Sequence, residues 1–221
     1  MRLQSSVPER GRRHLPATTA GPIVFIVDDD LAMRESLDGL MRDAGWHVKA
    51  YASAADFLAQ PRLGAPCCLV LDITLPDLSG LDLQRRIAAD GTGMPIIFIT
   101  GHGDVPTTVE AMKAGAVEFL TKPFGPEVLL EAVRQAIHTS ETILGREAEL
   151  RELRKRHESL SGREREVMAL VVTGLMNKQV GGDLGISEIT VKAHRGRLMR
   201  KMQARSLAEL VTMAASLRLA H

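Results

Sequence analysis

Carboxylate, hydroxyl and amine side chains follow four short apolar runs of the sequence. In chain order these groups are Asp28, Asp29 and Asp30 after residues 23–27, Asp72 after 69–71, Thr100 after 96–99, and Lys122 shortly after 117–120. If the apolar runs are parallel strands of one open sheet, their carboxyl ends meet at the edge where such sheets bind ligands. The sequence therefore predicts that two or three carboxylates, a hydroxyl and an ammonium lie close together.

The chemistry that this set of groups supports is phosphoryl transfer. Carboxylates a few Å apart repel one another unless a positive charge neutralises them. Mg²⁺ is suited to that position because it binds carboxylates together with phosphate oxygens. A carboxylate that attacks phosphorus needs only positioning and neutralisation of the charge on the phosphoryl oxygens. In this interpretation Asp72 is the nucleophile, Mg²⁺ and Lys122 supply positive charge, and Thr100 supplies a hydrogen-bond donor.

Strand-like and helix-like patterns alternate from Ile23 to His138. The predicted strands cover residues 23–27, 47–50, 68–71, 95–99 and 116–120, and the predicted helices cover 31–44, 53–59, 79–89, 104–114 and 126–138. Five units in which a strand precedes a helix predict an α/β fold with a doubly wound, five-stranded parallel sheet and helices on both faces. Such a sheet brings the carboxyl ends of its strands to one edge.

The segments on either side of this unit have different compositions. Residues 1–22 are rich in Pro, Thr, Ser and Arg, and we expect a disordered tail there. Residues 139–160 are charged and contain one glycine, Gly145, which predicts a helical linker. Apolar residues recur within it at heptad-like spacing, which is compatible with a continuing helix, with a solvated linker helix or with coiled-coil pairing of two chains. These residues are Ile143, Leu150, Leu153 and Leu160.

Residues 161–221 predict an all-α domain of four short helices. Ser161 and Glu164 have the spacing of a capping box, and Ser187 is a suitable N-cap for a helix over 188–202. A glycine-containing turn separates the second and third helices, as in a helix-turn-helix domain. Two adjacent glycines lie inside the second helix, and each costs about 1 kcal/mol relative to alanine, so we expect this helix to be soft.

Charge is distributed unevenly over the 221 residues, whose formal net charge is +1. Residues 23–138 contain 9 basic and 16 acidic residues, whereas 161–221 contain 10 basic and 5 acidic residues. This asymmetry indicates a metal or phosphate site followed by a domain that binds a polyanion. Apolar runs are too short to span a membrane, and the adjacent Cys67 and Cys68 suit neither a disulfide nor a metal site. We therefore expect a cytoplasmic protein with reduced thiols and no membrane partner.

Four motifs, in order, make residues 23–138 resemble the receiver domain of two-component response regulators. They are I-V-D-D-D at 26–30, L-D-I-T-L-P-D-L-S-G at 71–80, I-T-G-H-G-D at 99–104 and F-L-T-K-P-F at 119–124. The resemblance implies a flavodoxin-like fold in which Asp72 accepts phosphate from a histidine kinase. It also implies that Mg²⁺ is bound by Asp28, Asp29, Asp72 and the carbonyl of Thr74, that Lys122 meets the phosphoryl group, that Thr100 and Phe119 are the switch residues, and that the Lys122–Pro123 bond is cis.

Residues 161–219 resemble the LuxR-type helix-turn-helix domain, which together with the receiver indicates the NarL/FixJ family. The matching segments are L-S-G-R-E-R-E-V at 160–167, G-L-M-N-K at 174–178 and I-S-E-I-T-V-K-A-H at 186–194. Val180-Gly181-Gly182 departs from that pattern, which favours a branched residue followed by alanine. The resemblance implies a transcription factor whose partners are promoter DNA, RNA polymerase and, on phosphorylation, a second copy of the chain.

The predicted helix 188–202 can be divided into faces at 100° per residue. Val191, Leu198 and Met202 form a core stripe, whereas Ile189, Lys192, Ala193, Gly196 and Arg200 face the other way, toward a major groove. Lys192 is the best candidate for contact with guanine. Phosphate contacts are expected from Lys178, Thr190, Arg197 and Lys201. His194 and Arg195 lie near the core boundary, so phosphate contact and structural packing both remain open for them.

Three other functions compete with that of a phosphorylation-controlled transcription factor. An aspartyl phosphatase would need a second aspartate two residues after Asp72, and position 74 is Thr, so turnover of external substrates is not expected. A dinucleotide-binding domain is excluded because no G-x-G-x-x-G motif follows the first strand. A receiver that works unphosphorylated, through binding of a ligand or partner, stays open.

Overall fold

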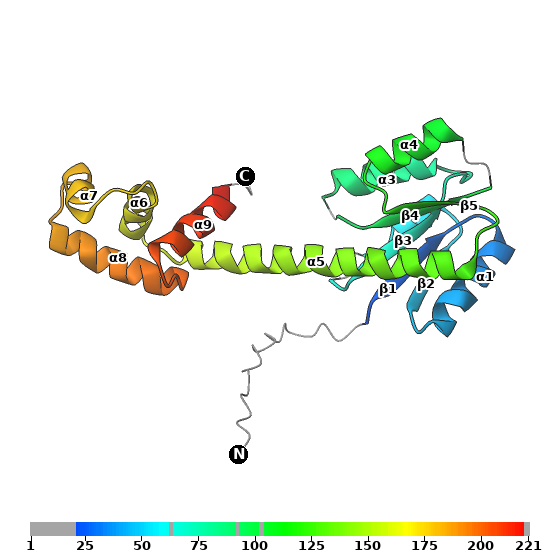
Figure 1. Ribbon diagram of the computed structural model, residues 1–221, viewed down its shortest axis with the longest axis horizontal. Helices are drawn as coiled ribbons and strands as arrows, with labels where there is room; N and C mark the ends of the chain where they lie inside the picture. The colour runs from blue at the N-terminus through cyan, green and yellow to red at the C-terminus, as the bar shows by residue number, and fades with distance from the viewer. Residues whose placement is uncertain (1–20, 62–63, 92, 102–103, 219–221) are drawn as a thin grey trace, which may run out of the picture. The chain divides into compact units, whose positions relative to one another are not determined.

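Figure 1 shows the computed structural model of the chain, which describes residues 21–61, 64–91, 93–101 and 104–218. The expected tail at residues 1–22 lies almost entirely outside these ranges. The chain divides between Leu144 and Gly145 into two compact units, here called the N-terminal and the C-terminal unit. No helix in the described ranges has an apolar stretch long enough to cross a membrane.

The N-terminal unit contains a five-stranded parallel sheet, as predicted. Its strands are β1 (Ile23–Val27), β2 (His47–Tyr51), β3 (Cys67–Asp72), β4 (Ile96–Thr100) and β5 (Glu118–Thr121). Their order in the sheet is β2-β1-β3-β4-β5, and every pair is parallel. The residues of β1, β3 and β4 are all buried, which is the pattern of central strands covered on both faces.

Helices cover both faces of the sheet, which confirms the doubly wound fold (Figure 1). The helices are α1 (Leu31–Asp43), α2 (Ala54–Leu58), α3 (Gly80–Ala89), α4 (Val105–Lys113) and α5 (Pro126–Glu158). On one face Phe57, Leu83 and Ala111 bring α2, α3 and α4 into a common core. On the other face Met41 of α1 and Val133 of α5 are fully buried. Alternate residues of the central strands supply the two cores.

One predicted element boundary is wrong, and one that the sequence leaves open is fixed by the structure. The last strand was expected over 116–120 but begins at Glu118, because the Ala116 amide donates to Ala111 O at the end of α4, ahead of the strand. The helix expected over 126–138 and the linker over 139–160 form one helix, α5, that continues to Glu158. A glycine within a helix is tolerated at a cost of about 1 kcal/mol, so Gly145 does not end it.

Three of the four residues at heptad-like spacing pack against other residues of the same chain. Leu160, just beyond the helix, is buried in the core of the C-terminal unit, and Leu153 packs against that core. Ile143 lies against Gly93, where an added Cβ would be 3.2 Å from the Ile143 side chain. The thiols of Cys67 and Cys68 are free and buried.

The C-terminal unit contains four further helices around their own core. They are α6 (Gly162–Val171), α7 (Asn177–Leu184), α8 (Glu188–Met202) and α9 (Leu207–Arg218). The capping box of Ser161 and Glu164 is present, and the Ser187 hydroxyl accepts from the Thr190 amide at the start of α8. Val180 of α7 and Val191 of α8 are fully buried in the common core, which confirms the helix-turn-helix arrangement.

The two glycines of α7 have different surroundings, and this revises their interpretation as softening residues. A Cβ added at Gly181 would lie 2.7 Å from the Ile186 carbonyl oxygen, whereas at Gly182 it would meet no described atom within 4 Å outside the backbone of its own helix. The Ile186 amide also donates to the Gly181 carbonyl at 3.0 Å. Gly181 therefore allows close approach of the turn before α8, and only Gly182 carries the helix cost without a packing reason.

Candidate functional site

The carboxylates predicted to cluster do so at the carboxyl edge of the sheet. Asp28 follows β1 and Asp72 ends β3, and each offers an oxygen within 4.8 Å of the others and of an oxygen of Asp29. Asp28 is fully buried and Asp72 is 7% exposed, whereas Asp29 is exposed. The cluster is therefore open to solvent on the side of Asp29 and closed by the protein behind Asp28.

The ammonium of Lys122 joins two of these carboxylates. Its Nζ lies 2.7 Å from Asp72 Oδ2 and 2.9 Å from Asp28 Oδ2. The Lys122 amide donates to Thr100 O at 2.8 Å, which fixes the backbone of this lysine. The Lys122–Pro123 bond is cis, as expected. Here Asp28, Asp29, Asp72 and Lys122 are called the acidic site.

Burial and charge act against each other in the acidic site. Burial raises the pKa of Asp28, and the hydrogen bonds from Lys122 and from the Asp30 amide only partly offset it. Burial lowers the pKa of Lys122, but its hydrogen bonds to Asp72 and Asp28 outweigh burial and leave that pKa raised. One ammonium thus faces three carboxylates, and an all-oxygen donor set with uncompensated negative charge fits a hard dication such as Mg²⁺.

The backbone after Asp72 is held by several short contacts. The Thr74 amide donates to Asp72 Oδ1 at 2.9 Å, which orients the carboxylate. Thr74 itself is exposed. The Gly80 amide donates to Ile73 O at 2.9 Å, and a Cβ added at Gly80 would lie only 2.6 Å from Asp72 O. Gly80 is the last residue of the motif at 71–80, and the sequence alone gives it no individual role. The structure shows that α3 approaches the Asp72 loop too closely for a side chain there.

Thr100 and Phe119 lie on adjacent strands beside the acidic site. Thr100 ends β4 and is 1% exposed, and Phe119 on β5 is half-buried. Phe119 pairs in register with Phe98, and the two ring centroids are 6.3 Å apart. The structure therefore brings both predicted switch residues to the β4–β5 edge.

Of three polar contacts near the acidic site, only the first follows a sequence pattern. Asp30 caps α1 by accepting from the Ala32 amide at 2.9 Å, as the N-cap pattern indicates. Arg34 donates from Nη1 to Asp28 O at 2.7 Å. Asp77 accepts from the Ala55 amide at 2.9 Å across 22 residues of sequence, and that hydrogen bond lowers its pKa. No sequence pattern pointed to the last two contacts. Arg34 and Asp28 are six residues apart but share no motif, and Asp77 and Ala55 meet only in the fold.

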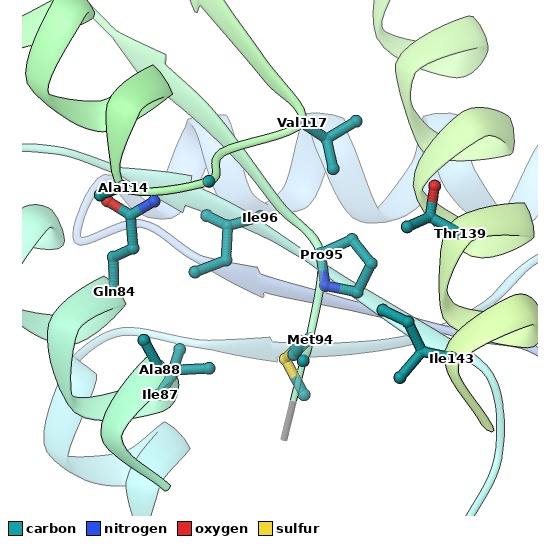
Figure 2. Close-up of a pocket in the computed structure, with 12 residues that line it drawn as sticks. Gln84, Ile87, Ala88, Met94, Pro95, Ile96, Ala114, Val117, Thr139 and Ile143 are labelled. Atoms are coloured by element: carbon teal, nitrogen blue, oxygen red, sulfur yellow. The ribbon is translucent and has the colours of Figure 1, made fainter. Parts of the chain in front are cut away.

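A cavity of about 280 Å³ lies at the opposite edge of the same sheet (Figure 2). Its lining includes Ile87 and Ala88 of α3, Pro95 and Ile96 where β4 starts, and Thr139 and Ile143 of α5, which face the cavity from the other side. The lining has no ionisable side chain. The cavity therefore lacks the groups that phosphoryl chemistry needs, and the acidic site is the candidate for that reaction.

The C-terminal unit presents a second candidate site, the outer face of α8. The buried residues of this helix are Val191, Leu198 and Met202, as predicted. The residues on the opposite side are exposed, and they define the outer face: Ile189, Lys192, Ala193, Gly196, Arg197 and Arg200. Lys178 at the start of α7 is also exposed, and Thr190 is half-buried.

Of the three other candidate DNA-contact residues, Lys201 and Arg195 form hydrogen bonds inside the unit, whereas His194 Nδ1 forms none to a described residue. Lys201 Nζ lies 2.6 Å from Glu164 Oε2 and donates to Ser159 O at 3.0 Å. Arg195 Nη1 donates to Asn177 Oδ1 at 3.0 Å. His194 Nδ1 is buried and has no hydrogen-bond partner among the described residues. The contacts of Lys201 and Arg195 join α8 to other parts of the unit, a structural role that sequence reasoning left open for Arg195 and did not foresee for Lys201.

Two family models match the chain. The response regulator receiver domain matches residues 24–134. The model described as bacterial regulatory proteins of the luxR family matches residues 158–214. The first match contains the acidic site, and the second contains the helix-turn-helix.

Named relatives are similar over nearly the whole chain. Nodulation protein W of Bradyrhizobium diazoefficiens is 50% identical over 204 residues, which cover 92% of this chain and 89% of that protein. The transcriptional regulatory protein FixJ of the same organism is 44% identical, with 89% of this chain and 96% of FixJ covered. The response regulator protein TodT of Pseudomonas putida is 44% identical over 92% of this chain and 88% of TodT.

Two solved structures are similar over most of the chain as well. The structure of the response regulator StyR has a TM-score of 0.77 at 48% identity and covers 89% of this chain and 99% of StyR. Full-length FixJ from B. japonicum has a TM-score of 0.52 at 41% identity, with 91% of this chain and 99% of FixJ covered.

Proposed function

The chain belongs to the NarL/FixJ family of two-component response regulators, with a receiver domain and a LuxR-type DNA-binding domain, and from this premise we propose how its residues work. Asp72 accepts a phosphoryl group from a sensor histidine kinase, and the phosphorylated chain pairs with a second copy and binds promoter DNA. The observation that carries the proposal is the ammonium of Lys122 bridging Asp72 and Asp28 at 2.7 and 2.9 Å.

The first step of the proposal is transfer of the phosphoryl group to Asp72. An oxygen of Asp72 attacks phosphorus, and the bond between phosphorus and the nitrogen of the kinase histidine breaks. Lys122 already contacts Asp72 Oδ2 and meets the charge on the phosphoryl oxygens as it is transferred. Asp28, Asp29, Asp72 and the carbonyl of Thr74 would hold Mg²⁺, which supplies the remaining charge neutralisation when it is bound.

The second step is a packing change between β4 and β5. The Thr100 hydroxyl turns toward the phosphoryl oxygens, and the Phe119 ring fills the space that the hydroxyl leaves. Such a two-state rearrangement carries a local change of charge to a distant surface. Support comes from the placement of Thr100 and Phe119 on adjacent strands, with the Phe119 ring half-buried against Phe98.

The surface that responds is the α4–β5–α5 side of the receiver, where we propose that two chains pair. Val105, Val109 and Met112 follow one another along one side of α4 and are 76%, 43% and 42% exposed. Spacings of four and three residues put side chains on one helix face. Burying such a stripe against a second copy removes apolar area from water, which favours association.

The output of the proposal is binding to a two-fold promoter site through the outer face of α8. Dimerisation raises avidity because two DNA-binding domains engage one site together. Lys192 is assigned to base contact and Lys178, Thr190 and Arg197 to phosphates, with Ala193 close to the bases and with His194, Arg195 and Lys201 in supporting contacts. RNA polymerase and the kinase complete the set of partners, and all of them act in the bacterial cytoplasm.

The test of the acceptor is labelling by a small phosphodonor. Acetyl phosphate with Mg²⁺ should give the wild-type chain an acid-labile phosphoryl group and should give Asp72→Asn none. Asp77→Asn is the control, because Asp77 accepts from the Ala55 amide at the start of α2 and lies outside the acidic site. Retained label on Asp72→Asn would place the acceptor elsewhere, and absence of label on the wild-type chain would favour a receiver that acts unphosphorylated.

A further inference from the structure

An isoleucine on α8 is unusually exposed. Ile189, the second residue of the helix, is 82% exposed, the largest exposure among the large hydrophobic residues of the described ranges. Single apolar residues on a surface are common and carry no meaning alone. The neighbours of Ile189 on the helix are what give its exposure a meaning.

Ile189 begins a stripe without polar groups along the outer face of α8. Ala193 and Gly196 follow at four and seven residues, on the same side of the helix and also exposed. Outside the backbone of its own helix, no described atom lies within 4 Å of a Cβ added at Gly196, so the surface there is open. Lys192 and Arg197 flank the stripe and are exposed. From Ile189 to Gly196 the face is thus apolar along its middle and cationic at its borders, and Arg200 follows at its C-terminal end.

The major groove contains one apolar group that such a stripe can recognise. Each base pair presents hydrogen-bond donors and acceptors there, and thymine adds its C5-methyl group, which apolar side chains contact. In helix-turn-helix proteins the first residues of the second helix contact base edges while cations bind the phosphates. Ile189 has the position for the first role, and its flanking cations have the charge for the second.

We propose that Ile189 is a specificity-determining residue that recognises a thymine methyl group in each half-site of the DNA. The inference rests on the proposed DNA-binding function and adds to it the kind of base feature that is recognised. A second protein copy is a less fitting occupant of this face, because two such faces would bring their lysine and arginine residues together.

The test uses the full-length chain and a DNA site selected from a random pool. Each thymine of the selected site is replaced in turn by deoxyuridine, which removes only the C5-methyl group, and affinity is measured for the wild-type chain, Ile189→Ala and Ile189→Val. The loss of one methyl contact should weaken wild-type binding about four-fold at one thymine per half-site, the factor that one buried methylene group gives. Ile189→Ala should lose this discrimination, and Ile189→Val should keep most of it.

Val211→Ala is the matched control, since Val211 is an exposed apolar residue of α9 and should leave discrimination unchanged. Specific binding by the wild-type chain with no effect of deoxyuridine at any thymine would overturn the inference while leaving the proposed function intact. Equal weakening of Ile189→Ala on thymine and deoxyuridine DNA would do the same, and would indicate contact with sugar or with a second copy. Failure of the chain to select any DNA would overturn both.

Discussion

The acidic site and the outer face of α8 both gather charged residues, but they treat charge in opposite ways. In the acidic site Asp28 is fully buried and Asp72 nearly so, and Lys122 bridges the two carboxylates. On the outer face Lys192 and Arg197 are exposed. A buried charge must be paired and oriented by the fold, whereas an exposed cation stays solvated until another molecule binds to it. Substitutions in the first region should therefore change stability, and in the second only binding.

The largest expected effect is the loss of the buried ammonium. In the presence of EDTA, Lys122→Ala should lower the free energy of unfolding of the N-terminal unit by about 3 kcal/mol, because two carboxylates lose their cation. Fluorescence of Trp46, the chain's one tryptophan, reports urea unfolding of this unit. Lys113→Ala, at an exposed position, should change stability by less than about 0.5 kcal/mol. Equal stability of the two variants would contradict a stabilising role for the bridge.

The next effect belongs to the outer face of α8 and should leave stability unchanged. Lys192→Ala should weaken specific promoter binding by about 1–3 kcal/mol and reduce the ratio of specific to non-specific affinity. Lys178→Ala, as a variant of a phosphate contact, should weaken both affinities alike and lower the salt dependence. The measurement is titration of specific and random DNA at several salt concentrations. If Lys192→Ala changed both affinities equally, base contact by Lys192 would be wrong.

A smaller effect distinguishes packing from propensity inside the C-terminal unit. Gly182→Ala should raise stability by up to about 1 kcal/mol, because alanine is the better helix former and its methyl group meets no described atom outside the backbone of its own helix. Gly181→Ala should be less stable than Gly182→Ala by about 2 kcal/mol, since its methyl group presses on the Ile186 carbonyl. Thermal unfolding followed by circular dichroism compares the two. If both substitutions stabilised the unit to the same extent, the close approach of the Ile186 carbonyl to Gly181 would be contradicted.

The smallest effect is a pH dependence at the cap of α6. The hydrogen bond from Lys201, together with that from the Ser161 amide, lowers the pKa of Glu164 below its ordinary value of 4.5. A lowered folded-state pKa contributes stability that is present above pH 4.5 and is lost as the pH falls through the folded value. Hydrogen-exchange protection of α6 amides should fall in that window.

The control for this pH dependence is the neighbouring exposed pair of Arg163 and Glu166. Glu164→Gln should abolish the fall in α6 protection below pH 4.5, because the titrating group is gone. Glu166→Gln should leave the fall in place, since its carboxylate is half exposed and contributes little. A fall that persists unchanged in Glu164→Gln would assign the pH dependence to another group.

The comparison also explains what could be predicted from the sequence. The five parallel strands follow from the alternation of strand-like and helix-like patterns, and the clustering of Asp28, Asp72 and Lys122 follows from short apolar runs that each precede a reactive residue. The periodicity and the residue types of each segment carry this information, and the parallel sheet brings the ends of the strands together. The core stripe of α8 was predicted for the same reason, because 3.6-residue periodicity separates its buried from its exposed face.

Contacts between distant segments could not be predicted in this way. Gly80 and Gly181 permit close approaches whose existence depends on where two elements cross. The pair of Lys201 and Glu164 spans 37 residues of sequence, and on a helix face Lys201 looks like any other exposed cation. The sequence left the length of α5 open, because a charged segment without breakers has the same pattern as a linker helix and as a continuing helix.

The central claim is that a phosphoryl group on Asp72 changes how the chain pairs. Sedimentation of the full-length chain with acetyl phosphate and Mg²⁺ measures this directly, with Asp72→Asn as the paired sample. We predict that the wild-type chain shifts from monomer to dimer on addition of the phosphodonor and that Asp72→Asn stays monomeric. A labelled wild-type chain that remains a monomer, or an Asp72→Asn chain that dimerises to the same extent, would contradict the account.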